Sequence, residues 1–190
     1  MTFFERGIEF NDKRIARLTL ECLDELNALD IHPYKLKSVK IRKQNTRFGT
    51  CHTKYIKAID EITRNDITIN RAFIEQNVDD KPIKTVIMHE LGHALKNCLH
   101  CGHDGEWAEY AEIVNDCYDM DITTYSSYEK YGLEKTDDRK TYRCKCSNCG
   151  KIIVAKQYRA PKWYRNPQGF VHTCADGTKH HIISEYYNKF

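Results

Sequence analysis

The chain has 190 residues, which is enough for one domain with a hydrophobic core and a small additional module but short for two full domains. A hydrophobic fraction of 41% and a charged fraction of 30% are typical of a folded, soluble protein, and no apolar run is long enough to cross a bilayer, which argues against a disordered or membrane-spanning chain. Charge is uneven: residues 139–190 contain 11 Lys and Arg against 2 Asp and Glu, whereas residues 1–138 contain 19 against 25.

The first predicted element is an amphipathic helix over residues 12–29. Asn11 or Asp12 would supply its N-cap, because short polar side chains accept hydrogen bonds from the free N–H groups of a first helical turn. The apolar residues recur at steps of three and four, the spacing of one helix face. They are Ile15, Leu18, Cys22, Leu26 and Leu29. We expect this face to lie on the core.

Three short strands are predicted after Pro33. The segments SVKIRK (38–43), YIKAIDEI (55–62) and DITIN (66–70) alternate apolar and polar residues or carry β-branched ones. The intervening NTRFGTCHTK (45–54) is predicted to be a turn around Gly49.

Three helices are predicted next, over residues 71–77, 82–98 and 105–118. The second is introduced by two aspartates and Pro82, because proline is tolerated in a helix only in the first turn. The third, GEWAEYAEIVNDCY, has a candidate core face. This face contains Trp107, Tyr110, Ala111, Val114 and Cys117.

The helix that begins at residue 82 contains the pattern H-E-x-x-H. His89 and His93 are four residues apart, so their imidazoles project from one helix face and can bind one ion. Glu90 would point beside that ion, where it can take a proton from metal-bound water. The flanking residues are apolar, and burying two histidines and a glutamate is unfavourable unless a metal compensates. The alternative is a buried helix whose histidines and glutamate form hydrogen bonds elsewhere.

A catalytic zinc needs a third protein ligand and an open position for water. His103 would stand just before the next helix, Cys101 is its main rival, and His100 lies in the turn and is less suited. Cys98 and Cys101 also form a C-x-x-C, which we interpret as two buried thiols. Gly92, inside the helix, costs about 1 kcal/mol relative to alanine and indicates that something packs closely against the backbone there.

HELGHAL followed by GHDGEWAEYAEIVN resembles the SprT-like family of zinc metallopeptidases, in which a third histidine follows H-E-x-x-H in a G-H-x-x-x-aromatic context. The preceding ITINRAFIEQ and the basic module behind the peptidase domain fit the same family, over about residues 35–190. TRFGTC is also similar to the R-W-G-S-C loop of a related group of small metallopeptidases, but there the third histidine follows sooner. The resemblance implies His89, His93 and His103 as ligands.

By this resemblance the chain is an enzyme, a zinc metalloendopeptidase that hydrolyses peptide bonds of a protein substrate. The metal would lower the pKa of its bound water and polarise the scissile carbonyl, while Glu90, as general base, accepts the water proton and passes it to the leaving amine. Tyr110 and Arg47 are candidates for stabilising the oxyanion.

The basic C-terminal part carries a second candidate metal site. Cys146 and Cys149 form a C-x-x-C-G, a zinc-knuckle spacing in which the glycine permits a tight backbone. Cys174 and His172 would return one hairpin later, although Gly177 stands where a further cysteine is expected. A module of about fifty residues has too small a core to fold without a staple, which favours structural zinc. The fourth ligand stays open among His172, His180, His181 and Cys144.

Basic and aromatic residues are interleaved in the same part of the chain. They are Lys151, Lys156, Arg159, Lys162 and Arg165 together with Tyr158, Trp163 and Tyr164. Positive charge binds phosphates and aromatic rings stack on unpaired bases, so DNA, single-stranded or in DNA–protein complexes, is a predicted partner. The family resemblance supports this, because known SprT-like peptidases include ones that act on proteins crosslinked to DNA. A solvated basic surface is the alternative.

We therefore predict an α+β fold with two parts. Residues 1–135 would form an SprT-like, zincin-like metallopeptidase domain with a small sheet and helices, and residues 140–190 a basic zinc-ribbon-like domain behind the polar linker GLEKTDDRKTYRCKC. The cofactors would be two Zn²⁺, one catalytic and one structural. The alternative function is a non-catalytic nucleic-acid-binding adaptor in which both sites are structural and a residue such as Cys101 closes the first.

The cellular location follows from cysteine use and from the N-terminal residues. Nine cysteines in a chain without an apolar signal segment favour metal ligation or burial over disulfides. We expect a cytoplasmic protein without a membrane partner, and its compactness suits a bacterial or phage-encoded chain in the host cytoplasm.

Overall fold

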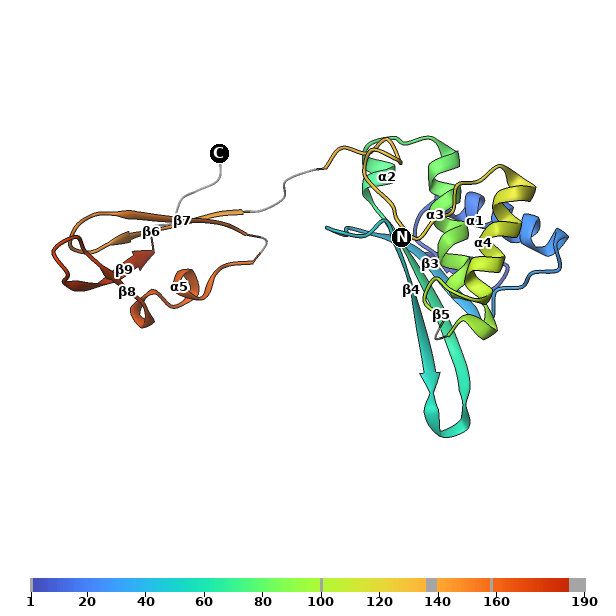
Figure 1. Ribbon diagram of the computed structural model, residues 1–190, viewed down its shortest axis with the longest axis horizontal. Coiled ribbons are helices and arrows are strands. Elements are labelled where there is room, and N and C mark those ends of the chain that lie inside the picture. Colours follow the sequence, from blue (N-terminus) through green and yellow to red (C-terminus); the bar gives the residue numbers. More distant parts are fainter. Residues whose placement is uncertain (1, 100, 136–139, 158, 185–190) are drawn as a thin grey trace. The chain divides into compact units, whose positions relative to one another are not determined.

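The computed structural model describes residues 2–99, 101–135, 140–157 and 159–184. The chain divides into two units, Met1–Glu134 and Lys135–Phe190, and each is described by itself (Figure 1). No helix among the described residues combines the length and apolarity needed to cross a bilayer.

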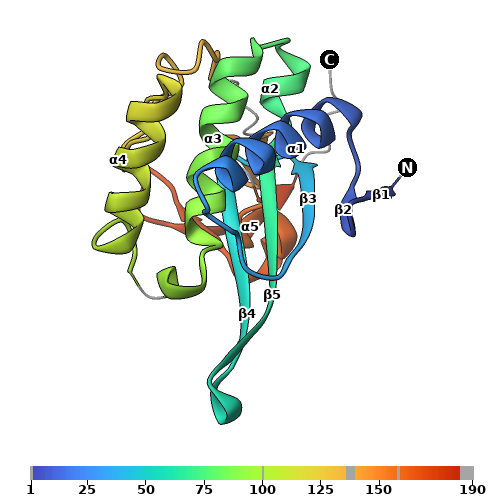
Figure 2. The same ribbon diagram turned by 90° about the vertical axis from the view of Figure 1, so that its right-hand side faces the viewer.

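Unit 1 is built on a five-stranded sheet with the strand order β1-β2-β3-β5-β4. The strands are β1 (Phe3–Glu5), β2 (Ile8–Phe10), β3 (Leu36–Arg42), β4 (Gly49–Ile56) and β5 (Glu61–Asn70). β2, β3 and β5 are parallel, whereas β1 and β4 run antiparallel to their neighbours. β4 is the last strand in this order and so forms one edge of the sheet. It is connected to β5 by a long hairpin that projects from the sheet (Figure 2).

Helices cover one face of this sheet. They are α1 (Lys13–Ala28), α2 (Ala72–Glu75), α3 (Asp80–His93) and α4 (Glu106–Tyr118), with the short 3-10 turns η1 (Lys57–Ile59) and η2 (Lys96–Cys98). α3 packs against α1, α4, β4 and β5, so it is the central helix of the layer (Figure 2). The core of unit 1 lies between these helices and the sheet. The predicted α+β class is confirmed.

The predicted N-terminal helix is confirmed as α1. Asp12 is its N-cap, and its carboxylate accepts a hydrogen bond from the N–H of Ile15 at 3.0 Å. Ile15, Leu18 and Cys22 are fully buried on the predicted face, and so is Leu26. The short helix predicted over residues 71–77 is also present, as α2.

α3 begins two residues before Pro82, which therefore lies in the first turn as predicted, but the helix ends at His93 rather than at residue 98. α4 matches its predicted range, although Cys117 is exposed and does not belong to the buried face. The close packing predicted at Gly92 is confirmed, since a Cβ there would lie 2.6 Å from Cε1 of Tyr110 and 2.9 Å from Nε1 of Trp107.

The predicted turn at residues 45–54 is correct only for residues 45–48, and the predicted strand at 55–62 is correct only at its two ends. The strand is β4, which begins at Gly49, and the chain turns at η1 and at Asp60, whose φ of 49° is left-handed. β4 looks polar in the sequence because its half-buried positions hold small side chains such as Cys51 and Thr53 between exposed His52 and Lys54. The N-terminal hairpin of β1 and β2 was not predicted.

Unit 2 is a four-stranded sheet with the order β7-β6-β9-β8. Its elements are β6 (Lys140–Cys146), β7 (Ile152–Gln157), α5 (Lys162–Arg165), η3 (Pro167–Gly169), β8 (Val171–Thr173) and β9 (Lys179–Ser184). β6 occupies the second half of the segment predicted as a linker, so that prediction is wrong from residue 140 onward. The buried positions of β6 hold Cys144 and Cys146 instead of aliphatic residues, and the strand therefore lacked an apolar pattern.

Candidate metal centres

α3 holds the first two predicted metal ligands in place because most of the helix is buried. Ile87, Met88 and Leu91 are fully buried against the core. The opposite part of the helix leaves His89 and His93 half-buried on successive turns, with ring centroids 5.1 Å apart.

His103, from the loop before α4, completes a cluster of three histidines. Its Nε2 lies 3.2 Å from Nε2 of His93 and 3.2 Å from Nε2 of His89. Nitrogens bound tetrahedrally to one Zn²⁺ at about 2.0–2.1 Å would be about 3.3–3.4 Å apart. The three residues therefore fit a zinc ion, and the structure brings together the trio predicted from the sequence.

The other sequence candidates for this site do not join the cluster. Cys101 is not part of the ligand group and instead interacts with the side chain of Cys98. His100 lies outside the described residues.

Burial keeps His89 and His93 in the protonation state that metal binding requires. Burial, reinforced by the neighbouring histidines, lowers the pKa of His89 to about 3, and burial with His103 lowers that of His93 to about 4. Both rings are neutral at pH 7 and can donate a lone pair to a cation. The ring of His89 also donates a hydrogen bond to the backbone carbonyl of Thr123, the kind of outer contact that orients a metal-binding histidine.

Trp107 supports all three histidine rings. It is buried at the start of α4, its ring is stacked on His93 with centroids 5.4 Å apart, and it meets His89 and His103 edge-on at 4.9 and 4.5 Å. The indole N–H also donates to the carbonyl of His89 at 3.4 Å. These contacts restrict the rotamers of the three side chains before any ion binds.

Glu90 lies beside the cluster, only 5% exposed, and contacts the first residues of β4. Burial raises the pKa of Glu90 to about 8. Two smaller effects lower this pKa: a hydrogen bond from the backbone N–H of Cys51 to the carboxylate, and the positive charge of Arg47. A Cβ at Gly49 would lie 2.5 Å from Oε1 of Glu90, so only glycine permits this approach. The backbone of β4 thus positions the carboxyl group.

A pocket of about 550 Å³ contains these groups. One side is β4, with Cys51 and Thr53, and the other includes the three histidines and Glu90. Of the two candidates for oxyanion stabilisation, Arg47 lines the pocket and Tyr110 does not. Among the described lining residues, Arg47 alone carries a basic side chain of the Lys or Arg type. The hydroxyl of Tyr110 instead donates to the carbonyl of Met88 at 2.8 Å inside the core.

Unit 2 has its own cluster of metal-binding side chains. Cys146, Cys149, His172 and Cys174 place their ligand atoms within 4.8 Å of one another, and the Sγ atoms of Cys146 and Cys174 are 3.7 Å apart. Three thiols and an imidazole form a common donor set for structural zinc. The cluster is compatible with the predicted zinc ribbon and includes His172 as the fourth member.

Two glycine turns build this second cluster. Gly150 has φ of 71° and donates to the carbonyl of Cys146, and Gly177 has φ of 83° and donates to that of Cys174. Although burial opposes it, backbone N–H groups of Asn148 and Cys149 lower the pKa of Cys146, which favours the thiolate. The alternative ligands Cys144, His180 and His181 are not in the group.

Sequence reasoning missed four contributors to the first site. Gly49, the backbone of Cys51, Thr123 and the ring-supporting role of Trp107 were not predicted. The similarity of TRFGTC to a metallopeptidase loop was the one sequence signal that pointed to β4, and it said nothing of what the strand contacts.

The sequence profile of the SprT-like family matches residues 19–126. This range is more than half of the chain and includes the three histidines and Glu90. No curated protein matches the chain.

Proposed function

The chain belongs to the SprT-like family, and on this basis we propose that it is a zinc-dependent metallopeptidase. Family membership suggests a metalloprotease-type enzyme. The observation that carries the proposal is the convergence of three histidine Nε2 atoms next to a buried glutamate in one pocket. Such a set leaves a fourth coordination position for water, as catalytic zinc sites do.

Each residue has a defined role in the proposed reaction. His89, His93 and His103 would hold the zinc ion, which when bound lowers the pKa of water and polarises a carbonyl group. Glu90 is the general base: its carboxylate accepts the proton of the attacking water and returns it to the leaving amine. The N–H of Cys51 and the absent side chain of Gly49 keep the carboxyl in place for both transfers.

Arg47 is the remaining charged group at the pocket and supports the negative charge that develops on the scissile carbonyl oxygen. Its guanidinium lies near enough to lower the pKa of Glu90 by its charge. A cation at the rim of a half-buried pocket stabilises an oxyanion more than it would in water. We therefore retain Arg47 as the candidate oxyanion stabiliser.

We propose that unit 2 holds a structural zinc and brings DNA to the peptidase. The exposed Lys162 and Arg165 flank Trp163 and Tyr164 on α5, and the ring of Tyr164 packs 4.9 Å from that of Tyr142. Cations with nearby aromatic rings suit a single strand of nucleic acid without sequence preference. Tyr158, also predicted to contribute, lies outside the described residues.

Glu90→Gln tests the proposal directly. The zinc content should stay at that of wild type, because Glu90 is not a ligand, while hydrolysis of an unfolded protein such as casein should fall by at least about 10²-fold. Glu112→Gln, on the exposed side of α4, is the matched control and should change neither.

The adaptor hypothesis predicts a different result. If wild-type protein carrying two zinc ions per chain hydrolyses no protein substrate, with or without single-stranded DNA, both sites are structural and the peptidase proposal fails. Equal hydrolysis by wild type and Glu90→Gln would also reject Glu90 as the general base.

A further inference from the structure

One side of the unit 2 sheet, here called the outer face, is exposed at every described position. The strand registers place alternate residues of the four strands on this side. They are residues 141, 143 and 145 of β6, residues 152, 154 and 156 of β7, residues 171 and 173 of β8, and residues 179, 181 and 183 of β9. All of these residues are exposed. The opposite face carries the buried Cys144, Cys146 and Ile182.

The outer face is unusually apolar for a solvated surface. Ile152, Val154, Val171 and Ile183 lie on it with exposures of 54%, 55%, 54% and 56%. An antiparallel sheet with one face on a core normally carries polar residues on its other face. Clustered exposed aliphatic side chains mark an interaction surface, whereas single ones do not.

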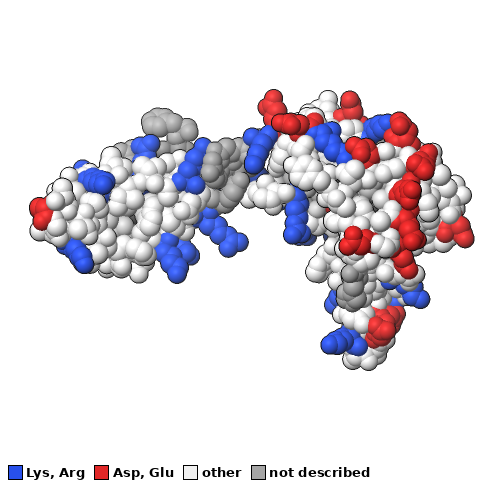
Figure 3. Space-filling model, viewed as in Figure 1, with Lys and Arg blue, Asp and Glu red and all other residues white. Residues whose placement is uncertain are grey.

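The same face is cationic and contains no Asp or Glu at its described positions. Lys145 stands in register between Ile152 and Ile183, and Arg143 stands opposite Val154. Lys and Arg are spread over unit 2 while most Asp and Glu lie on unit 1 (Figure 3). Cations thus alternate with aliphatic groups instead of forming a separate patch.

The chemistry of the face favours a protein over a nucleic acid. Bases bind by stacking on aromatic rings, and no aromatic residue other than His181 lies on the described outer face. The aromatic residues Tyr142, Trp163 and Tyr164 belong to the other face and to α5. Aliphatic side chains are covered best by other aliphatic groups, and the interleaved cations call for carboxylates beside them.

We propose that the outer face is a docking site for an acidic amphipathic segment of a partner protein. Aliphatic side chains of the segment would cover Ile152, Val154 and Ile183, and its carboxylates would pair with Lys145, which lies between these residues, and with Lys179 on β9. The site is separate from the histidine cluster, so this proposal does not depend on peptidase activity.

The test uses the full chain loaded with zinc and two synthetic probes. The first is an 18-residue helical peptide with leucines on one side and glutamates on the other, and the second has lysines in place of the glutamates. Binding is followed by amide chemical shifts. A triple variant carries threonine in place of three aliphatic residues, Ile152→Thr/Val154→Thr/Ile183→Thr. Threonine keeps the β-branched shape and removes the apolar contact. Ile56→Thr/Ile59→Thr, at the exposed β4–β5 hairpin tip, is the matched control.

The glutamate peptide should shift amides of β6, β7 and β9, and the triple variant should bind it roughly tenfold or more weakly at unchanged zinc content. The control variant should bind as wild type does, and the lysine peptide should not bind. The proposal would be overturned if the glutamate peptide did not bind, or if the triple variant or the lysine peptide bound equally well. It would also be overturned if oligo(dT) or phosphatidylglycerol vesicles, instead of the peptide, shifted the amides of the outer face.

Discussion

The backbone of β4 lies directly against Glu90 and restricts where its carboxyl group can lie. A Cβ at Gly49 would lie 2.5 Å from Oε1 and 2.7 Å from Cγ of Glu90, and the N–H of Cys51 hydrogen-bonds to the carboxylate. The placement of the proposed base therefore depends on a glycine that lies forty-one residues earlier in the chain, outside the H-E-x-x-H pattern.

Gly49→Ala should lower the free energy of unfolding by about 1–3 kcal/mol, because the new methyl group overlaps Glu90 and Val86. In a Glu90→Ala background the carboxyl arm is gone, so the same change should cost less than half as much. Urea denaturation of the four proteins measures this coupling. Gly169→Ala, whose Cβ would be no nearer than 3.4 Å to its neighbour, is the control. An equal cost in both backgrounds would contradict the contact.

The pH dependence of stability should report the buried carboxyl group. In metal-free protein, burial raises the pKa of Glu90 from 4.5 to about 8, so between these values the folded chain keeps a proton that the unfolded chain has released. Stability contributed by this group therefore decreases as pH rises through that window, at up to about 1.4 kcal/mol per pH unit.

Glu90→Gln removes this titration and leaves the histidines unchanged. The free energy of unfolding of the metal-free variant minus that of metal-free wild type should increase from pH 5 to pH 8, measured by urea denaturation at several pH values. A difference that does not change with pH would show that Glu90 titrates normally in the folded chain.

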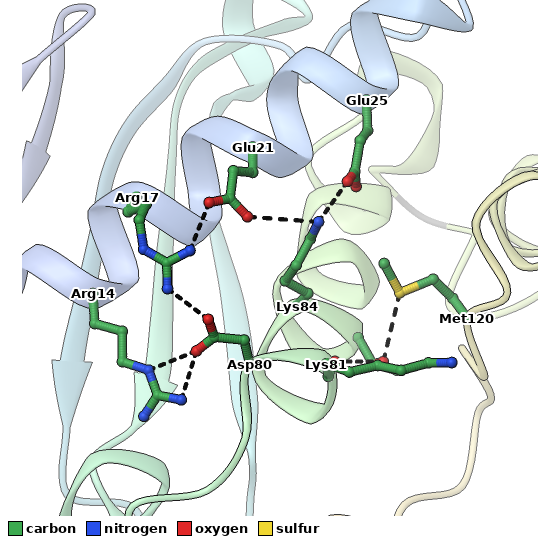
Figure 4. Close-up of polar contacts among 9 residues, drawn as sticks. Arg14, Arg17, Glu21, Glu25, Asp80, Lys81, Lys84 and Met120 are labelled. Carbon is green, nitrogen blue, oxygen red and sulfur yellow. Dashed lines mark hydrogen bonds and ion pairs between the residues drawn. The ribbon is translucent and has the colours of Figure 1, made fainter.

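At the scale of elements, charged side chains join α1 to α3. Arg14 and Arg17 of α1 both reach Asp80 at the start of α3 (Figure 4). Farther along, Lys84 lies between Glu21 and Glu25 (Figure 4). Lys84 is the least exposed of these cations, at 16%, so its ion pair with Glu25 should matter more than the solvent-exposed pairs.

Lys84→Met should destabilise unit 1 by about 1–3 kcal/mol, because it leaves the partly buried Glu25 carboxylate without its cation. Lys84→Met/Glu25→Met should recover most of that loss, since the two apolar side chains can pack between the helices. Thermal and urea denaturation provide the comparison. Arg6→Met, which removes an exposed ion pair with Asp24, should change stability by less than about 1 kcal/mol. A double variant no more stable than Lys84→Met would argue against this account.

At the level of the whole molecule, each unit has its own cluster of side chains that could hold a metal ion. The histidine cluster lies within Met1–Glu134 and the cysteine-rich cluster within Lys135–Phe190. The first uses nitrogen donors beside a pocket, and the second uses mainly thiols on the buried side of a small sheet. Loss of one metal should therefore leave the other in place.

His103→Ala and Cys174→Ala should each lose one of two zinc ions, measured as metal per chain by mass spectrometry. The two tryptophans separate the units spectroscopically, because Trp107 contacts the histidine cluster and Trp163 belongs to α5. In a Trp163→Phe background, zinc should alter Trp107 emission in Cys174→Ala but not in His103→Ala. One zinc that is insensitive to His103→Ala would reject the histidine assignment.

Much of unit 1 could be predicted from local patterns. α1, α2, α4 and the start of α3 follow from apolar spacing, an aspartate cap and a first-turn proline, all of which act within one helical turn. β4 could not be predicted in this way, because small polar residues at its half-buried positions hide the alternation. β6 was obscured for a related reason, since cysteines occupy its buried positions.

The H-E-x-x-H pattern and the residues around it were enough to predict the family. They also paired His89 with His93, because residues four apart on a helix share a face. The sequence also restricted the third ligand to three residues of the following loop, His100, Cys101 and His103. Three features became visible only in the folded chain: His103 joins the pair, β4 lies against Glu90, and Trp107 supports the three rings. These contacts connect segments far apart in the chain, and their geometry depends on how the helices pack on the sheet.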